Sequence, residues 1–557
     1  MIVSKRKFIL LLLFCLILIF TACEEGGAET TLPSETDAPT AEILPMLVEN
    51  GESAYAIVLP ERSNGDIRNA ANSFADKLGD IYGVKFEVKK NAKLAKGKKL
   101  ILIGAQAEAE FSSYYADVPY REYAMKLTED GNIVIAAWSV DAIGDCCSKL
   151  IMRLKKSFET GDTAGKITED VLVKGVDSSI IEAEVPHFSL NRMPTIYHIA
   201  GARGAYELCF KDSSADDWNA YIAKLTGKGF SLIQKNENTD ASFAVLGKNG
   251  TEITVDYWTA TKELAILIDK PSYQTPLKAE NFTATTTPVV IEPGLEYAGA
   301  LKGMCYVIQA SDGSFIIVDS GDSDPKFLDR LYSVLTERIA AGSKPHIRAW
   351  FVTHAHGDHM SGVVDIASSK YASQIKCDAI YSNMPHESYQ TAYDKSTYAG
   401  RISKLEKAAK TLGADYVTAR TGQTYYFADL EVQMLGSVDD MFLTEYNDLD
   451  ETSLVFTVKT ANKKMIFTGD AGPVVIGQYI MKRYTAATLK CDISQANSHG
   501  ANNSAHTQFY KAVDPDIYLW PASIEFYNKH TPNKHIESDS SAKIVYSYNG
   551  IYTIELK

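Results

Sequence analysis

Apolar and polar positions alternate along the chain in three successive groups of predicted elements. In the first group, residues 47–160, short apolar runs predict strands at residues 55–59, 84–88 and 99–104. Apolar residues at helical spacing predict helices at residues 67–81 and 140–156. Residues 123–138 predict a hairpin that turns at Asp130 and Gly131. The resulting order, β-α-β-β-β-β-α, indicates a small α/β domain.

The second group, residues 186–270, mixes one helix with several short strands. Ser214 is a typical N-cap for a helix that carries Trp218, and apolar runs on both sides of this helix predict strands. This pattern predicts a small α+β module. Its aromatic residues either line a binding face or pack in the core, and their spacing favours the core for Tyr206, Trp218, Tyr221 and Phe230.

The third group, residues 286–557, is the longest and follows a polar connector. Apolar runs predict strands at residues 305–310, 315–318 and 346–352, with a helix from Pro325. Strands and helices alternate from there onwards. We therefore expect an α/β multidomain chain, in which a C-terminal domain is preceded by two small α/β or α+β modules.

Residues 1–22 have the pattern of a signal peptide. Basic residues 5–7 precede an apolar run at residues 8–20, which is shorter than the roughly 20 residues that span a bilayer. The run leads to "FTAC", which resembles a bacterial lipobox and implies lipid attachment at Cys23. Ordinary secretion with an incidental cysteine is the alternative. We expect the protein at the extracellular face of a bacterial cell membrane, with its lipid as the anchor.

Charge changes this picture of possible partners. Residues 23–46 carry acidic residues and no basic ones, which predicts a disordered tether. The formal net charge is −14, and removal of the signal would make it −17. An acidic protein repels phosphate groups, so a nucleic-acid partner is disfavoured without being excluded. The cysteines after Cys23 are scattered and show no CxxC spacing, which predicts buried thiols rather than a zinc ribbon or a disulfide scaffold.

The segment "THAHGDHM" concentrates side chains that bind metals. His354 and His356 follow an apolar strand that ends at Val352, where α/β proteins place their sites. In an extended loop these two imidazoles point to one side, while Asp358 and His359 face the other way at a helix start. Such a set predicts two neighbouring divalent metal ions, with zinc as the expected metal and manganese or iron as alternatives. A purely structural metal site is the competing interpretation.

This HxHxDH motif after a strand resembles the signature of the metallo-β-lactamase fold hydrolases. The resemblance spans residues 286–557 and implies an αββα sandwich. It implies that Asp319, in "FIIVDSG", supports the metal loop, and that Asp470, in "MIFTGDAG", bridges the two metals. His499, in "SHGANNS", is implied as a ligand of the second metal. The metal ligands implied together are His354, His356, Asp358, His359, Asp470 and His499.

One ligand of the family is missing. Most members have a third histidine for the first metal between the HxHxDH motif and Asp470, where this chain has only His386, closer to the motif than the family spacing. "NDLDETSLVF" and "SHGANNS" most resemble the hydrolase domain of the competence DNA-uptake protein ComEC, although Ser498 replaces a histidine that is usual there. The candidates for the missing ligand are His386, Asn447 and water, and a substrate-facing role is the alternative for His386. His530, in "WPASIEFYNKH", is a candidate for substrate contact.

These features predict a cell-surface metal-dependent hydrolase in which a metal-bound hydroxide, oriented by Asp358, attacks the substrate. Because the ComEC-type branch resembles nucleases and phosphodiesterases, we expect a phosphodiester in a small molecule or polymer: a nucleotide, a nucleic acid or a wall polymer. The competing hypothesis is a non-catalytic glycan-binding or scaffold lipoprotein with a degenerate metal domain. It draws on the absent middle histidine and on the two leading modules, the first of which has a pattern that resembles the α/β domain preceding the catalytic barrel of α-glucuronidases and hexosaminidases. The pattern leaves the oligomeric state open.

Overall fold

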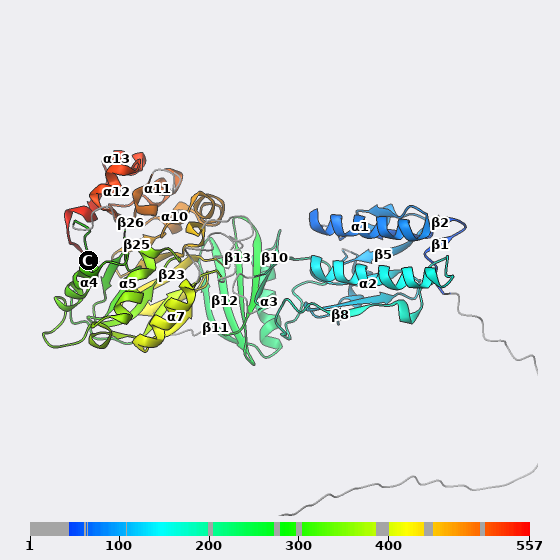
Figure 1. Cartoon of the computed structure of the whole chain (residues 1–557), viewed down its shortest axis with the longest axis horizontal. Helices are drawn as coiled ribbons and strands as arrows, with labels where there is room; N and C mark the ends of the chain where they lie inside the picture. The colour runs from blue at the N-terminus through cyan, green and yellow to red at the C-terminus, as the bar shows by residue number, and fades with distance from the viewer. Residues whose placement is uncertain are drawn as a thin grey trace, which may run out of the picture. The chain divides into compact units, whose positions relative to one another are not determined.

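The computed structural model describes residues 44–60, 63, 65–106, 108–198, 204–271, 279–296, 303–385, 400–438, 449–501 and 507–557 (Figure 1). The elements discussed below all belong to the compact unit Pro45–Lys557. The predicted signal, the lipid site at Cys23 and most of the predicted tether lie outside the described residues, as do His386 and Asn447. The last tether residues are ordered, contrary to the prediction: the carbonyl of Pro45 accepts the N–H of Ile167 at 2.8 Å, and Met46 forms a β-bridge with Lys166. Within the described ranges, no helix combines the length and the apolar character needed to cross a membrane.

The first sheet has the order β4-β3-β5-β7-β6-β8 and carries two helices on one face. Its strands run parallel from β4 to β7, while β6 is antiparallel to both of its neighbours. The helices α1 (Gly65–Tyr82) and α2 (Val140–Glu159) pack against it through Phe74 and Leu150. The predicted order of elements is confirmed, and Gly131 turns the hairpin with a φ of 76°. The strands are β3 (Tyr55–Val58), β4 (Glu87–Lys89), β5 (Lys99–Ile103), β6 (Glu122–Leu127), β7 (Ile133–Ala136) and β8 (Lys174–Val176), preceded by a short hairpin of β1 (Val48–Glu49) and β2 (Glu52–Ser53).

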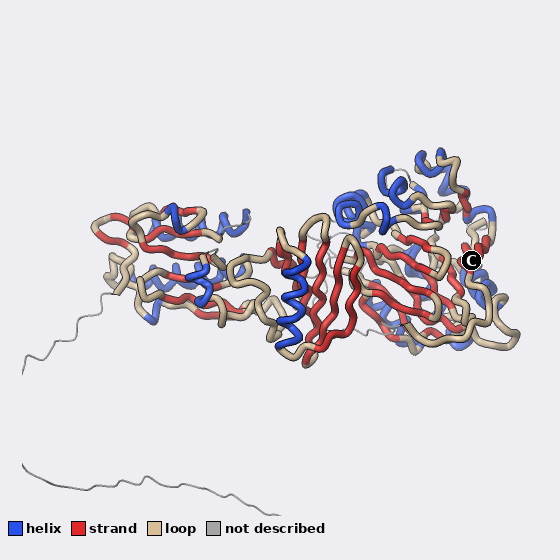
Figure 2. Tube along the Cα trace, turned by 180° about the vertical axis from the view of Figure 1, so that it is seen from behind, coloured by secondary structure: helices blue, strands red, loops and turns tan. Residues whose placement is uncertain are grey.

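An antiparallel sheet with one helix follows, and α3 (Ala215–Gly227) lies along one of its faces (Figure 2). Ser214 caps this helix as predicted, since its side chain accepts the N–H of Asp217 in a capping box. The predicted core aromatics are confirmed as core, because Tyr206, Trp218, Tyr221 and Phe230 are between 0% and 4% exposed. The strands are β9 (Thr195–His198), β10 (Tyr206–Phe210), β11 (Ser231–Glu237), β12 (Ala241–Lys248), β13 (Thr251–Trp258) and β14 (Glu263–Asp269).

Two mixed sheets pack face to face in the C-terminal domain, with orders β21-β20-β18-β17-β16-β15-β29 and β22-β23-β24-β25-β26-β27-β28. Tyr306 and Phe351 of the first sheet meet Val432 and Phe456 of the second in one apolar layer. The helices α4, α5 and α7 cover the outer face of the first sheet, and α10, α11 and α13 cover that of the second. This arrangement is the expected αββα sandwich. The sandwich keeps the loops at the strand ends free for a site.

The elements of the two sheets have the following bounds. The first sheet contains β15 (Val289–Glu292), β16 (Tyr306–Gln309), β17 (Phe315–Val318), β18 (His346–Phe351), β19 (Lys376–Cys377), β20 (Ala379–Ser382), β21 (Asp415–Thr418) and β29 (Tyr552–Glu555). The second contains β22 (Thr424–Phe427), β23 (Leu430–Gly436), β24 (Val455–Lys459), β25 (Lys464–Phe467), β26 (Ile493–Gln495), β27 (Ile517–Trp520) and β28 (Lys543–Tyr546). The helices are α4 (Pro325–Thr336), α5 (Gly357–Ser368), α7 (Arg401–Leu412), α9 (Met481–Arg483), α10 (Ala486–Leu489), α11 (Thr507–Val513), α12 (Ile524–Lys529) and α13 (Lys534–Ser538).

Buried polar contacts join the antiparallel sheet to the C-terminal domain. Arg420, which follows β21, is 3% exposed and pairs with Asp269, while its Nε lies 3.9 Å from Glu252. A buried guanidinium needs such partners because its desolvation is costly. Gln234 adds two hydrogen bonds to the backbone of Thr424, with lengths of 2.7 and 3.0 Å. The module is therefore part of one packed body with the C-terminal domain.

Every cysteine that the structure describes is a buried free thiol, as predicted. These residues are Cys146, Cys147, Cys209, Cys305, Cys377 and Cys491.

Candidate metal centre

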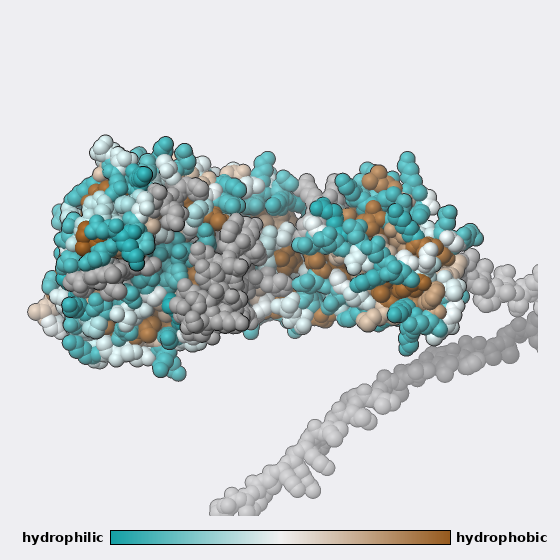
Figure 3. Space-filling model, turned by 45° about the horizontal axis from the view of Figure 1, so that its top comes forward, coloured by the Kyte–Doolittle hydropathy of each residue, from teal (hydrophilic) through white to brown (hydrophobic). Residues whose placement is uncertain are grey.

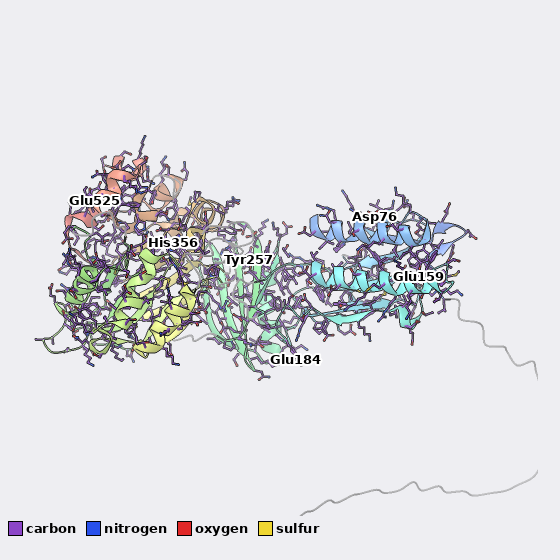
Figure 4. The ribbon with its side chains drawn as sticks, viewed as in Figure 1. Asp76, Glu159, Glu184, Tyr257, His356 and Glu525 are labelled. Atoms are coloured by element: carbon purple, nitrogen blue, oxygen red, sulfur yellow. The ribbon has the colours of Figure 1, made fainter. Side chains whose placement is uncertain are left out.

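The metal loop begins where β18 ends and continues into α5, so its side chains sit at the carboxyl end of a buried strand. His354 and His359 are completely buried, and His356 is partly exposed at the N-cap of α5 (labelled in Figure 4). Asp358 lies in the first helical turn, as expected. The Nε2 of His354 and the Nδ1 of His356 are 2.8 Å apart, so the two imidazoles converge.

Asp319 fixes this loop from beneath. Its carboxylate accepts the backbone N–H of Thr353 at 2.7 Å and the hydroxyl of Thr353 at 2.9 Å. The second oxygen also lies 2.8 Å from Nδ1 of His359. A partner at Nδ1 holds the ring so that Nε2 faces the site. Asp319 thus contacts both the metal loop and one of its imidazole rings.

Two further strand ends bring their side chains to the same place. Asp470 follows β25, and its backbone N–H donates to Ser453 at 3.1 Å. His499 has a φ of 56°, and its Nδ1 lies 2.8 Å from the carbonyl of Pro521, which orients Nε2 towards the loop. This Nε2 is 3.1 Å from Asp358 and 3.4 Å from Asp470. The late histidine and the "TGD" aspartate therefore meet the HxHxDH motif in space.

The side chains form two groups suited to cations. One consists of His354, His356, Asp450 and Asp470, and the other of Asp358, His359 and His499. Within each group, one ligand atom per residue lies within 4.8 Å of all the others. A cation bound about 2 Å from each donor requires donors roughly 3 Å apart, so these separations fit metal ions. All six predicted ligands belong to one of the groups.

Buried atoms in the centre support the same fit. Nε2 of His359, Nε2 of His499 and Oδ1 of Asp470 are buried and have no hydrogen-bond partner of good geometry among the described residues. A polar atom in such a position costs free energy unless something binds it. A cation in each group would satisfy these lone pairs.

The charges of the centre favour cation binding too. Burial would raise the pKa of Asp470, but His359 and His499 outweigh burial and hold it well below its ordinary value. Burial alone would lower the pKa of His499, but Asp470 and Asp358 raise it to about 9. Burial and the adjacent His359 hold the pKa of His354 well below its usual range, so this imidazole is neutral. A divalent cation would supply positive charge to the same carboxylates. Binding of a cation therefore competes with protonation of His499.

Asp450 is a residue that the sequence reasoning missed. It opens a short 3₁₀ turn, η5 (Asp450–Thr452), in "NDLDETSLVF", where Asn447 is the predicted candidate. Its Oδ1 lies 2.7 Å from Nδ1 of His356 and 3.6 Å from Nε2 of His354. The local signal was an acidic residue three positions from Asn447 in a segment already singled out. His386 and Asn447 lie outside the described residues and stay predictions.

Arg401 is a second residue that the sequence reasoning missed, and unlike Asp450 it has no signal in the sequence. It begins α7, and its guanidinium donates to the carbonyl of Ala355 inside the metal loop. A methyl group added at Gly357 would lie 3.8 Å from its Nη1. A cationic side chain therefore borders the loop between the two histidines of the first group.

The remaining predicted residues lie farther from the centre. His530 is exposed and stacks on Phe526 at 4.1 Å, and Phe526 is 5.5 Å from His499, so one ring separates His530 from the second group. Ser498 donates to the carbonyl of Asp470 at 3.1 Å. His346 lies at the opposite end of β18, where it pairs with Asp378 at 2.7 Å.

One of the comparisons with known proteins identifies the family of the C-terminal domain. Residues 298–504 match the family model of the Metallo-beta-lactamase superfamily. No curated protein matches the chain. A metallo-beta-lactamase fold protein, YhfI from Bacillus subtilis, is 12% identical with a TM-score of 0.29, and the match covers 48% of this chain and 100% of that one. A diphosphatase from the PhnP family is 12% identical with a TM-score of 0.30, covering 48% of this chain and 98% of that one.

A long-form RNase Z from yeast is 10% identical with a TM-score of 0.29, and the match covers 56% of this chain and 50% of that one. Likenesses at this level carry no information about substrate. The family match and the two packed sheets with outer helices together establish a C-terminal domain with the metallo-β-lactamase fold.

Proposed function

We propose that the C-terminal domain, with its metallo-β-lactamase fold, is a two-metal hydrolase that cleaves a phosphodiester. One observation carries this proposal: two groups of metal ligands converge at the ends of the central strands, and Asp470 lies close to both groups. Bound divalent ions would lower the pKa of water and offset negative charge in the transition state. The first group would hold one ion and the second group the other.

The protein's own residues would prepare the reaction. Asp358 has a buried carboxylate 3.1 Å from His499, at the position from which it would orient the attacking water. Asp319 and the carbonyl of Pro521 fix the rings of His359 and His499, so that little reorganisation is needed.

A phosphodiester is favoured over a neutral substrate because of Arg401. A planar guanidinium that borders the metal loop suits the oxygens of a phosphate group. The net charge of −14 argues against long nucleic acids, whose binding depends on basic surfaces. The visible face of the C-terminal domain is mostly hydrophilic, with small separate apolar groups (Figure 3). A small phosphodiester or a wall polymer accords best with these features.

The proposal includes the cell surface as the place of action. It is supported by the basic and apolar pattern of residues 1–22 and by the lipobox-like "FTAC" that ends at Cys23. Metabolic labelling with a palmitate analogue would test it: the label should enter the wild-type protein and be absent from Cys23→Ser. Labelling of the variant would contradict the anchor.

The central experiment measures metal content and hydrolysis of bis-(p-nitrophenyl) phosphate by the full chain in detergent. His354→Ala should lose turnover by at least about 1000-fold, because one ligand of the first group is gone. His346→Ala is the matched control, since this histidine lies at the other end of the same strand. Bound metals without hydrolysis of phosphodiester, ester or lactam substrates would favour the scaffold hypothesis. The buried aromatic residues of the antiparallel module give that alternative no support.

A further inference from the structure

We infer that Asp450 is a ligand of the first metal, in the place of the missing histidine, and that its carboxylate shifts the preference of the site from Zn²⁺ towards Mn²⁺. This inference rests on the proposed function, because it concerns the same centre. It replaces the candidates His386, Asn447 and water by a residue whose position is known.

The geometry of Asp450 is that of a donor. Its Oδ1 is 2.7 Å from His356 and 3.6 Å from His354, the two histidines that lack a third partner in the motif. It also belongs with Asp470 to a set whose donor atoms all lie within 4.8 Å of one another. The side chain of Asp450 is 33% exposed, so one side of this set stays open to a substrate. An open side is typical of catalytic rather than structural metal sites.

The turn that presents Asp450 is fixed on the side of Asp470. The carboxylate of Glu451 accepts the backbone N–H groups of Val474 and Val475 at 3.3 and 2.9 Å. The space beside it is so tight that a methyl group at Gly472 would lie 2.2 Å from Glu451. Glu451 therefore acts as a structural anchor, and its neighbour Asp450 is the acid that faces the histidines.

The same turn is fixed on the side of the metal loop. The hydroxyl of Ser453 lies 3.2 Å from Nδ1 of His354 and accepts the N–H of Asp470 at 3.1 Å. The backbone N–H of Leu454 donates to the carbonyl of Thr353 at 3.0 Å. Contacts on both sides hold Asp450 in register with the histidines and favour metal binding, since a preorganised ligand loses little entropy.

The donor set determines the metal. With Asp450, the two groups contain four imidazoles and three carboxylates. Imidazole suits zinc, whereas carboxylate oxygen suits manganese. A carboxylate in place of the histidine therefore weakens the advantage of Zn²⁺ over Mn²⁺ at the first metal.

The test uses the full chain in detergent, stripped of metal and titrated by calorimetry with Mn²⁺ or Zn²⁺ alone. Electron paramagnetic resonance of bound Mn²⁺ gives a second readout that is independent of turnover. The wild type should bind two ions. Asp450→Ala should retain one ion and bind the other at least about 10-fold more weakly, since even loss of an indirect support for a ligand costs that much.

Asp450→His should restore the histidine set and raise the ratio of Zn²⁺ to Mn²⁺ affinity by about 10-fold. Asp450→Asn keeps the shape if the alanine variant fails to fold, and it should show the same loss of one ion. Asp415→Ala is the matched control, because this exposed aspartate begins β21 at the opposite end of the sheet. It should leave both affinities unchanged.

The possible results separate this inference from the proposed function. Two ions bound equally well by the wild type, Asp450→Ala and Asp450→Asn would overturn the inference, whatever the activity. An unchanged affinity ratio in Asp450→His would overturn the claim about metal preference. If the wild type binds two ions and Asp450→Ala only one, the inference holds even when no phosphodiester is cleaved, and then the proposed function alone fails. A wild type that binds no ion would refute both.

Discussion

Parallel strands end in comparable loops at two edges of this protein, one in the first domain after β3 and β5, the other in the C-terminal domain after β18. In the first domain, β3 has β4 on one side and β5 on the other, so the strand order reverses there. Such a switch point is where open α/β sheets bind ligands. Here Met193 lies against the loop after β5, where its sulfur accepts the N–H of Ala105 at 3.1 Å.

The edge after β18 carries histidine and aspartate side chains in place of a methionine. His354, Asp358 and His359 follow the strand, and Asp470 and His499 join them from the second sheet. The backbone offers a site at both edges, but among the described residues only the C-terminal edge brings histidines and carboxylates together at metal-ligand spacing. The comparison teaches that the fold provides the place and the loop residues provide the chemistry.

Among the variants that test this difference between the two edges, Arg401→Ala should have the largest effect on substrate binding. Loss of a charged hydrogen bond to a phosphate should raise the KM for bis-(p-nitrophenyl) phosphate by about 10- to 100-fold. Steady-state kinetics would measure it, with Arg401→Lys keeping part of the effect. Lys404→Ala serves as the control, because Lys404 is an exposed cation on the same helix. An unchanged KM in Arg401→Ala would remove the main argument for an anionic substrate.

A smaller effect, on stability rather than on turnover, is expected for Glu252→Gln. This variant tests whether a buried polar group near the C-terminal edge can matter for stability alone. Burial raises the pKa of Glu252 to about 7, although Arg420 opposes this shift. Because the folded pKa exceeds the unfolded one of 4.5, the favourable contribution of protonated Glu252 is complete below pH 4.5 and is lost as the pH rises through 7. The stability advantage of the variant over the wild type should therefore grow by roughly 3 kcal/mol as the pH rises from 4.5 to 8.

Denaturant unfolding of both proteins at pH 5 and pH 8 checks this gain. Asp269→Asn is the contrasting variant, because it deprives the buried Arg420 of its closest charged partner and should destabilise the protein at both pH values. Turnover should change in neither variant beyond the loss of folded protein. A relative stability of Glu252→Gln that is independent of pH would contradict the prediction.

The smallest effect on function is expected for Met193→Ala at the edge of the first domain. Removal of this partly buried side chain should cost about 1–2 kcal/mol of unfolding free energy. Hydrolysis by the folded protein should stay the same, because Met193 contacts Ala105 in the loop after β5 and not the metal centre. If turnover fell while metal content stayed normal, the contrast between an inert edge and an active one would break down.

Local pattern was enough for much of the fold. Helix α3 follows its Ser214 cap, and the hairpin of β6 and β7 turns at Gly131, because these signals lie within a few residues of the elements they control. Nothing in the local sequence signals that β15 pairs with β29. Val290 lies opposite Ile554, and contacts across so much sequence depend on packing that no local period records.

The site, like the fold, has one part that local sequence motifs indicate and another part that depends on long-range contacts. The HxHxDH motif and the aspartate of "TGD" are compact patterns with a chemical reason behind each residue, so sequence indicated their place. Asp450 lies in a run of polar residues in which several could reach a metal. Only the turn held by Glu451 and Ser453 distinguishes it, and that turn is fixed by long-range hydrogen bonds.

The contact between Gln234 and Thr424 has a consequence for solubility. β22 is an edge strand of its sheet, and Thr424 turns its N–H and C=O away from β23. The amide of Gln234 occupies both groups in the way that another strand would. A C-terminal domain cut from the antiparallel module would present an open strand edge, and such edges recruit further chains into aggregates. The module thus protects its neighbour from self-association.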